Sequence, residues 1–235
     1  MINTSPLTDR ILYEDNHLII INKLPSEIVQ GDKTGDTPLS EKVAAYIAEK
    51  YNKPGKAFIG VVHRLDRPVS GAVVFARTSK GLTRLNEQLR DRQFDKTYWA
   101  VVKNKPPKEE DHLISWMIRN EKQNKSYCYD YEKNNSLKAE LAYKLIASSD
   151  RFHLIEVKLF TGRHHQIRAQ LASIGCPIKG DLKYGFPRSN EGGFIHLHAR
   201  SVTLIHPTLK TPVSVIAKPP ADSLWDFFIS AVENR

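Results

Sequence analysis

The sequence has little cysteine and no long apolar run, and each absence excludes a class of protein. Its only cysteines are Cys128 and Cys176, with no CxxC pair and no zinc-ligand spacing, which is typical of a reducing compartment and argues against a disulfide scaffold. The best apolar run, residues 18–21, is far shorter than the roughly 20 residues of a membrane-spanning helix. Residues 1–10 lack a basic head followed by an apolar core, so we expect no secretory signal and a cytoplasmic protein.

Nucleotide-binding signatures are also missing. No G-x-x-x-x-G-K-[ST] loop occurs and no Rossmann glycine fingerprint follows an expected strand, so phosphoryl transfer has little support. The charge points elsewhere: 35 Lys and Arg against 26 Asp and Glu give a net charge of +9 and a pI near 9.4. This balance suits a polyanionic partner. We find no basic amphipathic helix of the kind that binds a membrane surface.

The periodicity of the apolar residues predicts an α+β protein. Helical spacing occurs over residues 39–51, after Ser79, and over residues 162–174 and 221–232, with Thr161 as the expected cap of the third helix. Alternating or continuous apolar patterns predict strands at residues 11–15, 18–23, 95–103, 112–119, 136–148, 151–160, 196–206 and 212–217. We therefore expect a single domain over residues 11–235, after an extension of residues 1–10, with a large, mixed but mostly antiparallel sheet flanked by helices.

One segment sets a carboxylate between two guanidinium groups. Residues 63–71 have the sequence HRLDRPVSG, and Pro68 and Gly71 predict a loop between the apolar runs at residues 58–62 and 72–76. Asp66 then stands between Arg64 and Arg67, which favour its ionised form, the form that a nucleophile requires. The alternative is an Arg–Asp pair that only tethers the loop.

Four segments, taken in order, resemble the RluA family of pseudouridine synthases. Residues 63–77 are similar to its Asp-containing motif, and residues 96–102 are similar to its K-x-Y-x-A strand. The third segment is TGRHHQIRAQL at residues 161–171, followed by GDLKYG at 180–185. The fourth is HLHAR at residues 196–200, followed by HP at 206–207. The resemblance implies the pseudouridine synthase fold, isomerisation of specific uridines in ribosomal or transfer RNA, and no cofactor or metal. Three departures are KLPSE at residues 23–27 in place of K-P-x-G, Val69 in place of Thr, and the lack of the family's N-terminal RNA-binding domain.

The resemblance also implies roles for single residues. Asp66 would be the nucleophile on a flipped-out uridine, at C1′ or at uracil C6, with Arg168 as the partner of its carboxylate. Tyr98 would stack on the uracil and take part in removing the C5 proton, and Ile167 would pack against the base. Arg64 would fill the gap left by the extruded base. Further substrate contacts are expected from His63, Arg67 and Arg163, and contacts to phosphate from Lys23, Arg67, Arg77, Arg84, Arg163 and Lys183.

Two other function classes stay open at this stage. His196 and His198 alternate on one strand and, with His164 or His165, could ligate the cation of a metal-dependent hydrolase. A non-catalytic RNA-binding module would use the charge together with Tyr127, Tyr129 and Tyr131, although that run is more simply an exposed alternating strand. The expected partner is an RNA stem-loop, without a membrane or an obligate protein partner, and the expected state is a monomer.

Overall fold

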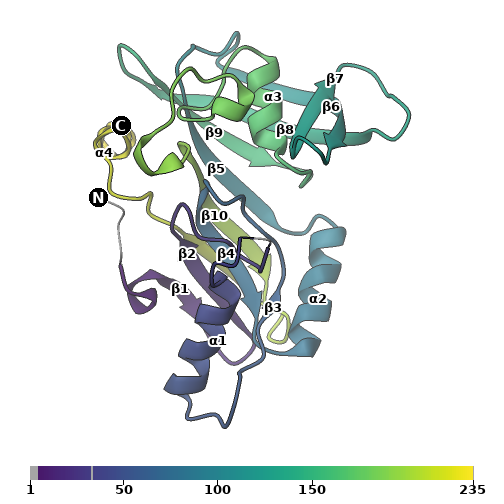
Figure 1. Cartoon of the computed structure of the whole chain (residues 1–235), viewed down its shortest axis with the longest axis vertical. Coiled ribbons are helices and arrows are strands. Elements are labelled where there is room, and N and C mark those ends of the chain that lie inside the picture. Colours follow the sequence, from purple (N-terminus) through teal and green to yellow (C-terminus); the bar gives the residue numbers. More distant parts are fainter. Residues whose placement is uncertain (1–4, 33, 235) are drawn as a thin grey trace. The chain divides into compact units, whose positions relative to one another are not determined.

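The structure, a computed structural model, describes residues 5–32 and 34–234. Over this part of the chain it has four α-helices and a sheet of eleven strands, in two compact units (Figure 1). Unit 1 comprises Met1–Asp95 and Ala199–Pro220, and unit 2 comprises Lys96–His198 and Ala221–Arg235. The expected α+β class, with a mostly antiparallel sheet flanked by helices, is confirmed. Residues 1–4 of the expected extension lie outside the described residues.

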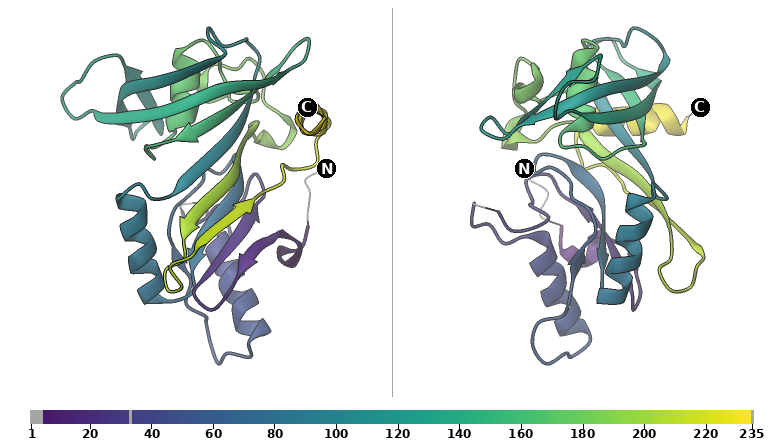
Figure 2. Two further views of the ribbon diagram at one scale, coloured as in Figure 1. Left: turned by 180° about the vertical axis from the view of Figure 1, so that it is seen from behind. Right: turned by 90° about the vertical axis from the view of Figure 1, so that its right-hand side faces the viewer.

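Two strands of unit 1, β2 (Leu18–Lys23) and β4 (Ser70–Ala76), are buried on both faces. The strands of the unit follow the order β1 (Ile11–Glu14), β2, β4 and β10 (Leu197–Ile205), with β3 (Gly60–Val61) beside β4 and β11 (Pro212–Ile216) beside β10. Leu82, Leu85 and Leu89 of α2 (Ser79–Arg90) pack on one face. Figure 2 shows α1 (Leu39–Lys50) on the opposite side of these strands. Continuous apolar runs such as residues 18–21 are what two covered faces require.

The cap of α2 differs from the expectation by one residue. The side chain of Thr78, and not that of Ser79, accepts the hydrogen bond from the backbone N–H of Gly81 at 3.0 Å. Ser79 is the first helical residue. Both residue types are good caps, and Thr78 has the extended backbone that a capping residue adopts.

Unit 2 is an antiparallel sheet with a helix on each of two apolar patches. Its strands follow the order β5 (Asp95–Val102), β9 (His153–Leu159), β8 (Leu137–Ser148), β6 (Glu110–Asn120) and β7 (Lys125–Tyr129). Trp225 and Phe228 of α4 (Ser223–Glu233) pack with Trp99 and Leu154. Ala169 of α3 (Gln166–Ser173) packs in a second cluster with Met117, Ala139 and Tyr184. The interpretation of the tyrosine run as an exposed strand is confirmed only in part: Tyr127 and Tyr129 lie in β7, whereas Tyr131 follows the end of that strand.

Helix α3 begins four residues later than expected. His165 has a left-handed backbone (φ 55°) directly before Gln166, so residues 162–165 are not helical. The expected cap, Thr161, donates instead to the side-chain oxygen of Gln166 at 2.7 Å. A non-glycine residue in the left-handed region needs support from its surroundings, and the side chain of His165 receives it from a hydrogen bond to Tyr184 at 3.0 Å.

Candidate active site

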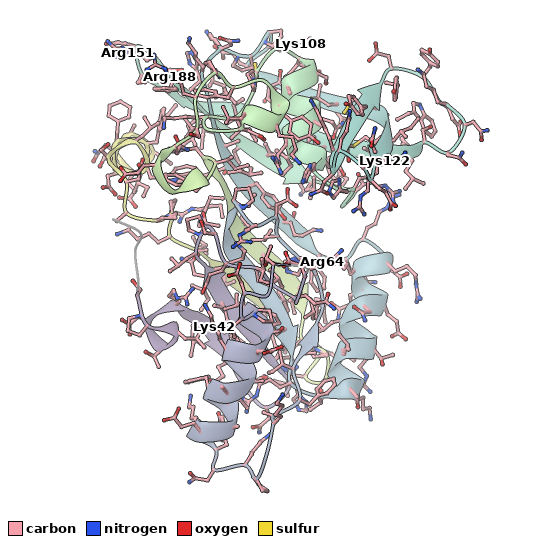
Figure 3. All side chains as sticks on the ribbon, in the orientation of Figure 1. Lys42, Arg64, Lys108, Lys122, Arg151 and Arg188 are labelled. Carbon is pink, nitrogen blue, oxygen red and sulfur yellow. The ribbon has the colours of Figure 1, made fainter. Side chains whose placement is uncertain are left out.

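Asp66 lies on the loop between β3 and β4 of unit 1, as the sequence predicts. Leu65 and Val69 on either side of it are buried. The backbone N–H of Val69 donates to the carbonyl of Asp66 at 3.0 Å, which closes a turn. The side chain of Asp66 is only half-buried, and its neighbour Arg64 is exposed (Figure 3). The loop is therefore anchored by apolar residues while its carboxylate remains within reach of solvent.

A buried ammonium group holds this loop from beneath. Lys23, at the end of β2, is 0% exposed. Its Nζ donates to three carbonyl oxygens, those of Leu24 at 2.9 Å, Arg67 at 3.2 Å and Val69 at 2.6 Å. Burial lowers the pKa of Lys23 to about 7, while the carboxylates of Glu27 and Asp66 act in the opposite direction. The expectation that Lys23 contacts phosphate is wrong, because its ammonium group is buried and donates to backbone carbonyls.

Gly71 fixes the other end of the loop. Its φ is +119°, and a Cβ at this position would lie 2.4 Å from the carbonyl oxygen of Ala199 in β10. No L side chain fits such a conformation or such a contact. The glycine of the HRLDRPVSG segment therefore permits the close approach of β4 and β10 directly after the loop.

The other predicted residues of this loop have different environments. Nε2 of His63 accepts a hydrogen bond from the backbone N–H of Val74 at 3.2 Å, and the ring packs edge-on against Phe94. Arg67 is exposed and forms an ion pair with Asp36. His63, Arg64, Asp66 and Arg67 thus share one loop, with His63 turned to the strand and the two arginines at the surface.

In unit 2, Arg168 of α3 forms a forked ion pair with Asp181. Nε donates to Oδ2 at 2.7 Å and Nη2 donates to Oδ1 at 2.8 Å, and the side chains of both residues are almost fully buried. The guanidinium also lies 5.1 Å from the ring centroid of Tyr184. Sequence reasoning gave Asp181 no role, although it belongs to the GDLKYG segment that carried part of the resemblance. A fork to a carboxylate fixes the plane of a guanidinium.

Tyr184 ties the loop before α3 to strand β7. Its hydroxyl accepts from the backbone N–H of Ser126 at 2.8 Å, which leaves its own proton for Nδ1 of His165 at 3.0 Å. Burial lowers the pKa of His165 to about 2, and the charge of Arg168 acts in the same direction. His165 is therefore neutral and serves as a fixed support rather than as a titrating group.

Two further predicted residues of unit 2 are Ile167, on helix α3, and Tyr98, on strand β5. Ile167 precedes Arg168 on α3, and both are buried. Tyr98 is buried in β5, opposite Val157 of β9. The structure thus places Ile167 and Arg168 side by side on one helix and Tyr98 on a strand of the same unit.

A buried amide group organises the loop that carries Arg163. Oε1 of Gln166 accepts from the hydroxyl of Thr161 and from the backbone N–H of Arg163 at 3.0 Å. Nε2 of Gln166 donates to the side chain of Gln170 at 2.9 Å. Nε of Arg163 donates to the carbonyl of Lys138 at 3.0 Å. The amide oxygen of Gln166 therefore fixes the segment that carries Arg163, while its amide nitrogen bonds to Gln170 and to the carbonyl of Glu140.

The expected phosphate contacts beyond the loop fall into two groups. Arg77 is 7% exposed; it bonds to Glu14 and the Asp15 carbonyl and stacks on Tyr51, so the expectation is wrong for Arg77 as it is for Lys23. Arg84 and Lys183 remain at the surface, where each donates to a backbone carbonyl. Both cations remain candidates for contacts with phosphate.

The histidines that might have bound a metal are engaged with protein groups. Nε2 of His196 pairs with Asp222 at 3.1 Å, its Nδ1 accepts from Asn190 at 3.0 Å, and its ring stacks on Trp225. Over residues 5–32 and 34–234, no group of three His, Cys, Asp or Glu side chains is arranged to hold a metal ion. In the same part of the chain no helix is long and apolar enough to cross a membrane.

Known proteins with similar sequences are RNA pseudouridine synthases. The sequence model of the family described as RNA pseudouridylate synthase matches residues 17–173. A ribosomal large subunit pseudouridine synthase C of Rickettsia bellii is 31% identical over 219 residues, which cover 91% of this chain and 69% of the relative. The RNA pseudouridine synthase YhcT of Bacillus subtilis, itself uncharacterized, is 33% identical over 217 residues, which cover 90% of this chain and 69% of the relative.

A solved structure shares the fold. Human RNA pseudouridylate synthase domain containing 4 superposes with a TM-score of 0.77 at 24% identity, covering 97% of this chain and 94% of the human chain. At that identity the likeness establishes the fold alone. The family match and the relatives confirm the resemblance found in the ordered motifs. The chain belongs to the RNA pseudouridylate synthase family, isomerases that convert uridine in RNA to pseudouridine, and it is of the RluA type.

Proposed function

We propose that this enzyme isomerises specific uridines of ribosomal RNA, with Asp66 as the nucleophile on a flipped-out base. The observation that supports this most is the construction of the Asp66 loop. Two hydrogen bonds from Lys23, to the carbonyls of Arg67 and Val69, and the glycine at position 71 hold its backbone, while Asp66 itself is half-buried. A carboxylate on a rigidly held loop is suited to attack, since positioning supplies much of the rate.

The chemistry requires the bond between N1 and C1′ to break and a bond between C5 and C1′ to form. In this proposal the Asp66 carboxylate either attacks C1′ and displaces N1 of the uracil, or adds to uracil C6 before the N1–C1′ bond breaks. The base then turns and C5 bonds to C1′. The carboxylate is displaced from C1′ in the first route and is eliminated from C6 in the second. The proton on C5 is then lost and N1 gains a proton. The reaction is an isomerisation, so no electrons enter or leave and no redox partner is needed.

Tyr98 and Arg168 complete the proposed catalytic group. Tyr98 stacks on the uracil and its hydroxyl takes part in the removal of the C5 proton. Arg168 pairs with the carboxylate of Asp66 and orients it. Its fork to Asp181 supports this role, because that fork fixes the plane of the guanidinium. Ile167 packs against the base, and Arg64 occupies the space from which the uridine is extruded.

We infer the substrate from the name of a relative and from the charge of the chain. The Rickettsia relative is named as an enzyme of the ribosomal large subunit, so we favour large-subunit ribosomal RNA, with a transfer RNA stem-loop as the second candidate. A net charge of +9 suits either polyanion. His63, Arg67 and Arg163 are the proposed further contacts to the RNA. We propose that the enzyme acts as a monomer in the cytoplasm.

Deletion of the gene in its source organism tests this function. Pseudouridines are mapped in total RNA from the wild-type strain, from the deletion strain, and from the deletion strain complemented with the wild-type gene or with Asp66→Asn. We expect one or a few sites in ribosomal RNA to vanish on deletion and to return only with the wild-type gene. Unchanged pseudouridine maps, or full restoration by Asp66→Asn, would refute the proposal.

A further inference from the structure

Lys96 is a cation of unit 2 that has no role in the proposed reaction. It is the second residue of β5, two positions before Tyr98. Because side chains alternate along a strand, Lys96 and Tyr98 point to the same face of the sheet. Lys96 is half-buried. A long cationic side chain at the start of a strand more often extends fully into solvent.

The ammonium group of Lys96 lacks a counter-charge. Across residues 5–32 and 34–234, no hydrogen bond or ion pair joins its Nζ to another group, and burial alone lowers its pKa. The other buried lysines differ. Lys23 donates to three carbonyls, and Lys179 donates to the side chain of Asn190 at 2.6 Å. A half-buried cation without a partner costs free energy in the isolated protein, which a bound anion would recover.

The neighbourhood of this ammonium leaves room for an anion. A Cβ built on Gly162 would lie 3.9 Å from Nζ of Lys96, and within the described residues, its two chain neighbours apart, no other atom lies within 4 Å of that Cβ. Gly162 is exposed and precedes Arg163 on the loop that leads to α3. The absence of a side chain at position 162 therefore leaves one side of the Lys96 ammonium uncovered.

We propose that Lys96 binds one phosphate group of the RNA backbone, next to the uridine on which Tyr98 stacks. The inference rests on the proposed function, because it takes Tyr98 as the residue that meets the base. A phosphate suits the site because it is the anion that accompanies every uridine in RNA. An ion pair formed at a half-buried position is also screened less by water and salt than one at the open surface.

The first test measures the salt dependence of RNA binding. The probe is a fluorescein-labelled RNA stem-loop with a loop of uridines only, titrated with the full chain over a range of KCl concentrations. We expect Lys96→Met to weaken binding by about fivefold and to reduce the slope of log Kd against log [KCl] by about 0.7 to 0.9, the value for one lost phosphate contact. Lys96→Arg should keep the slope.

The matched control is Lys144→Met. Lys144 is exposed on β8 opposite Glu156, which bonds to Trp99, so it lies on the face of the sheet away from Tyr98. It removes the same charge, and we expect it to change the affinity by less than about twofold. Equal effects of Lys96→Met and Lys144→Met on the slope would overturn the proposal, because the loss would then reflect net charge only.

A second test places a carboxylate beside Lys96. Gly162 has no left-handed backbone that would strain a side chain, and among the described residues not adjacent to it in the chain only Lys96 lies within 4 Å of its Cβ position, so Gly162→Glu and Gly162→Gln should both fold. The Glu side chain can pair with the ammonium, and we expect it to weaken binding of the same RNA about fivefold more than Gln does. In a Lys96→Met background this difference should shrink to less than about twofold. An undiminished difference would overturn the subsite.

A third test identifies the ligand as a phosphate and separates this inference from the proposed function. Single uncharged methylphosphonate linkages are moved through the loop of the probe, and pseudouridine formation is measured on the unmodified RNA. We expect one linkage to weaken binding to wild type but not to Lys96→Met. If wild type forms pseudouridine and no linkage behaves in this way, the subsite is wrong and the proposed function stands. If one linkage does and wild type modifies no RNA, the phosphate subsite stands and the proposed function fails.

Discussion

Arg168 and Asp181 share two parallel hydrogen bonds, at 2.7 and 2.8 Å, in the interior of unit 2. Arg168 lies on α3, while Asp181 precedes the short turn at Leu182–Tyr184. The pair therefore joins the helix to the following loop and holds one guanidinium in a fixed plane. A buried ion pair of this kind contributes little against an apolar replacement, but loss of one partner leaves an uncompensated charge.

Asp181→Asn should destabilise the protein strongly. The amide keeps the shape of the side chain but removes the charge that compensates Arg168, so we expect the free energy of unfolding to fall by about 3 kcal/mol. Urea denaturation followed by circular dichroism measures the change. Asp150→Asn, at an exposed turn between β8 and β9, is the control and should change stability by less than about 0.5 kcal/mol. Similar stabilities of the two variants would contradict this account of the pair.

Local patterns predict the elements of this fold better than its long-range polar contacts. The loop at Asp66 follows from Pro68 and Gly71, whose backbone preferences act locally, and the extent of β2 (Leu18–Lys23) was predicted without error. Burial of Lys23 was not predictable, because its acceptors on Arg67 and Val69 are 44 and 46 residues away. From sequence alone, a lysine at the end of an apolar strand is expected at the surface, because the carbonyls that accept its hydrogen bonds come from a distant part of the chain.

The sequence did not predict the start of α3 or the role of Asp181, because both depend on contacts between residues that are distant in the chain. Thr161 is a good capping residue ahead of the apolar residues Ile167, Leu171 and Ile174, so the local signal favours a helix that begins at residue 162. A bond to the Tyr184 hydroxyl supports the left-handed backbone of His165, and this bond joins residues 19 positions apart. Asp181 belongs to the GDLKYG segment, but its partner Arg168 lies 13 positions away, and only that contact reveals what it does.

Lys23 should make stability depend on pH above neutrality. Its pKa is about 7 in the folded protein against the ordinary 10.5, so between these values the unfolded chain binds more protons and stability rises with pH. Relative to Lys23→Met, the wild-type free energy of unfolding should increase by about 2 kcal/mol from about pH 7 to about pH 9. Urea denaturation across this range measures it. Parallel pH profiles of the two proteins would show that the Lys23 ammonium does not titrate there.

Gly71→Ala should be among the most damaging single substitutions in unit 1. The new Cβ would meet the backbone of Ala199 at 2.4 to 2.7 Å, and alanine would also be strained at φ +119°. We expect a loss of at least about 3 kcal/mol, or failure to fold. Gly31→Ala is the control, since no atom of the described residues, its chain neighbours apart, lies within 4 Å of its Cβ position. Thermal unfolding of both variants measures the effect. Similar midpoints for Gly71→Ala and Gly31→Ala would rule out the close approach of β4 to β10.

Asp66→Asn should separate catalysis from binding. The amide has the size of the carboxylate, so the loop held by Lys23 keeps its shape, but an amide cannot act as the nucleophile. We expect the single-turnover rate of pseudouridine formation to fall on the order of 10³-fold or more, with the Kd for RNA within about threefold of wild type. Asp91→Asn, at the exposed end of α2, controls for the charge change. A rate near that of wild type would exclude Asp66 as the nucleophile. A large loss of RNA affinity would instead identify Asp66 as a residue that organises the RNA contacts of its loop.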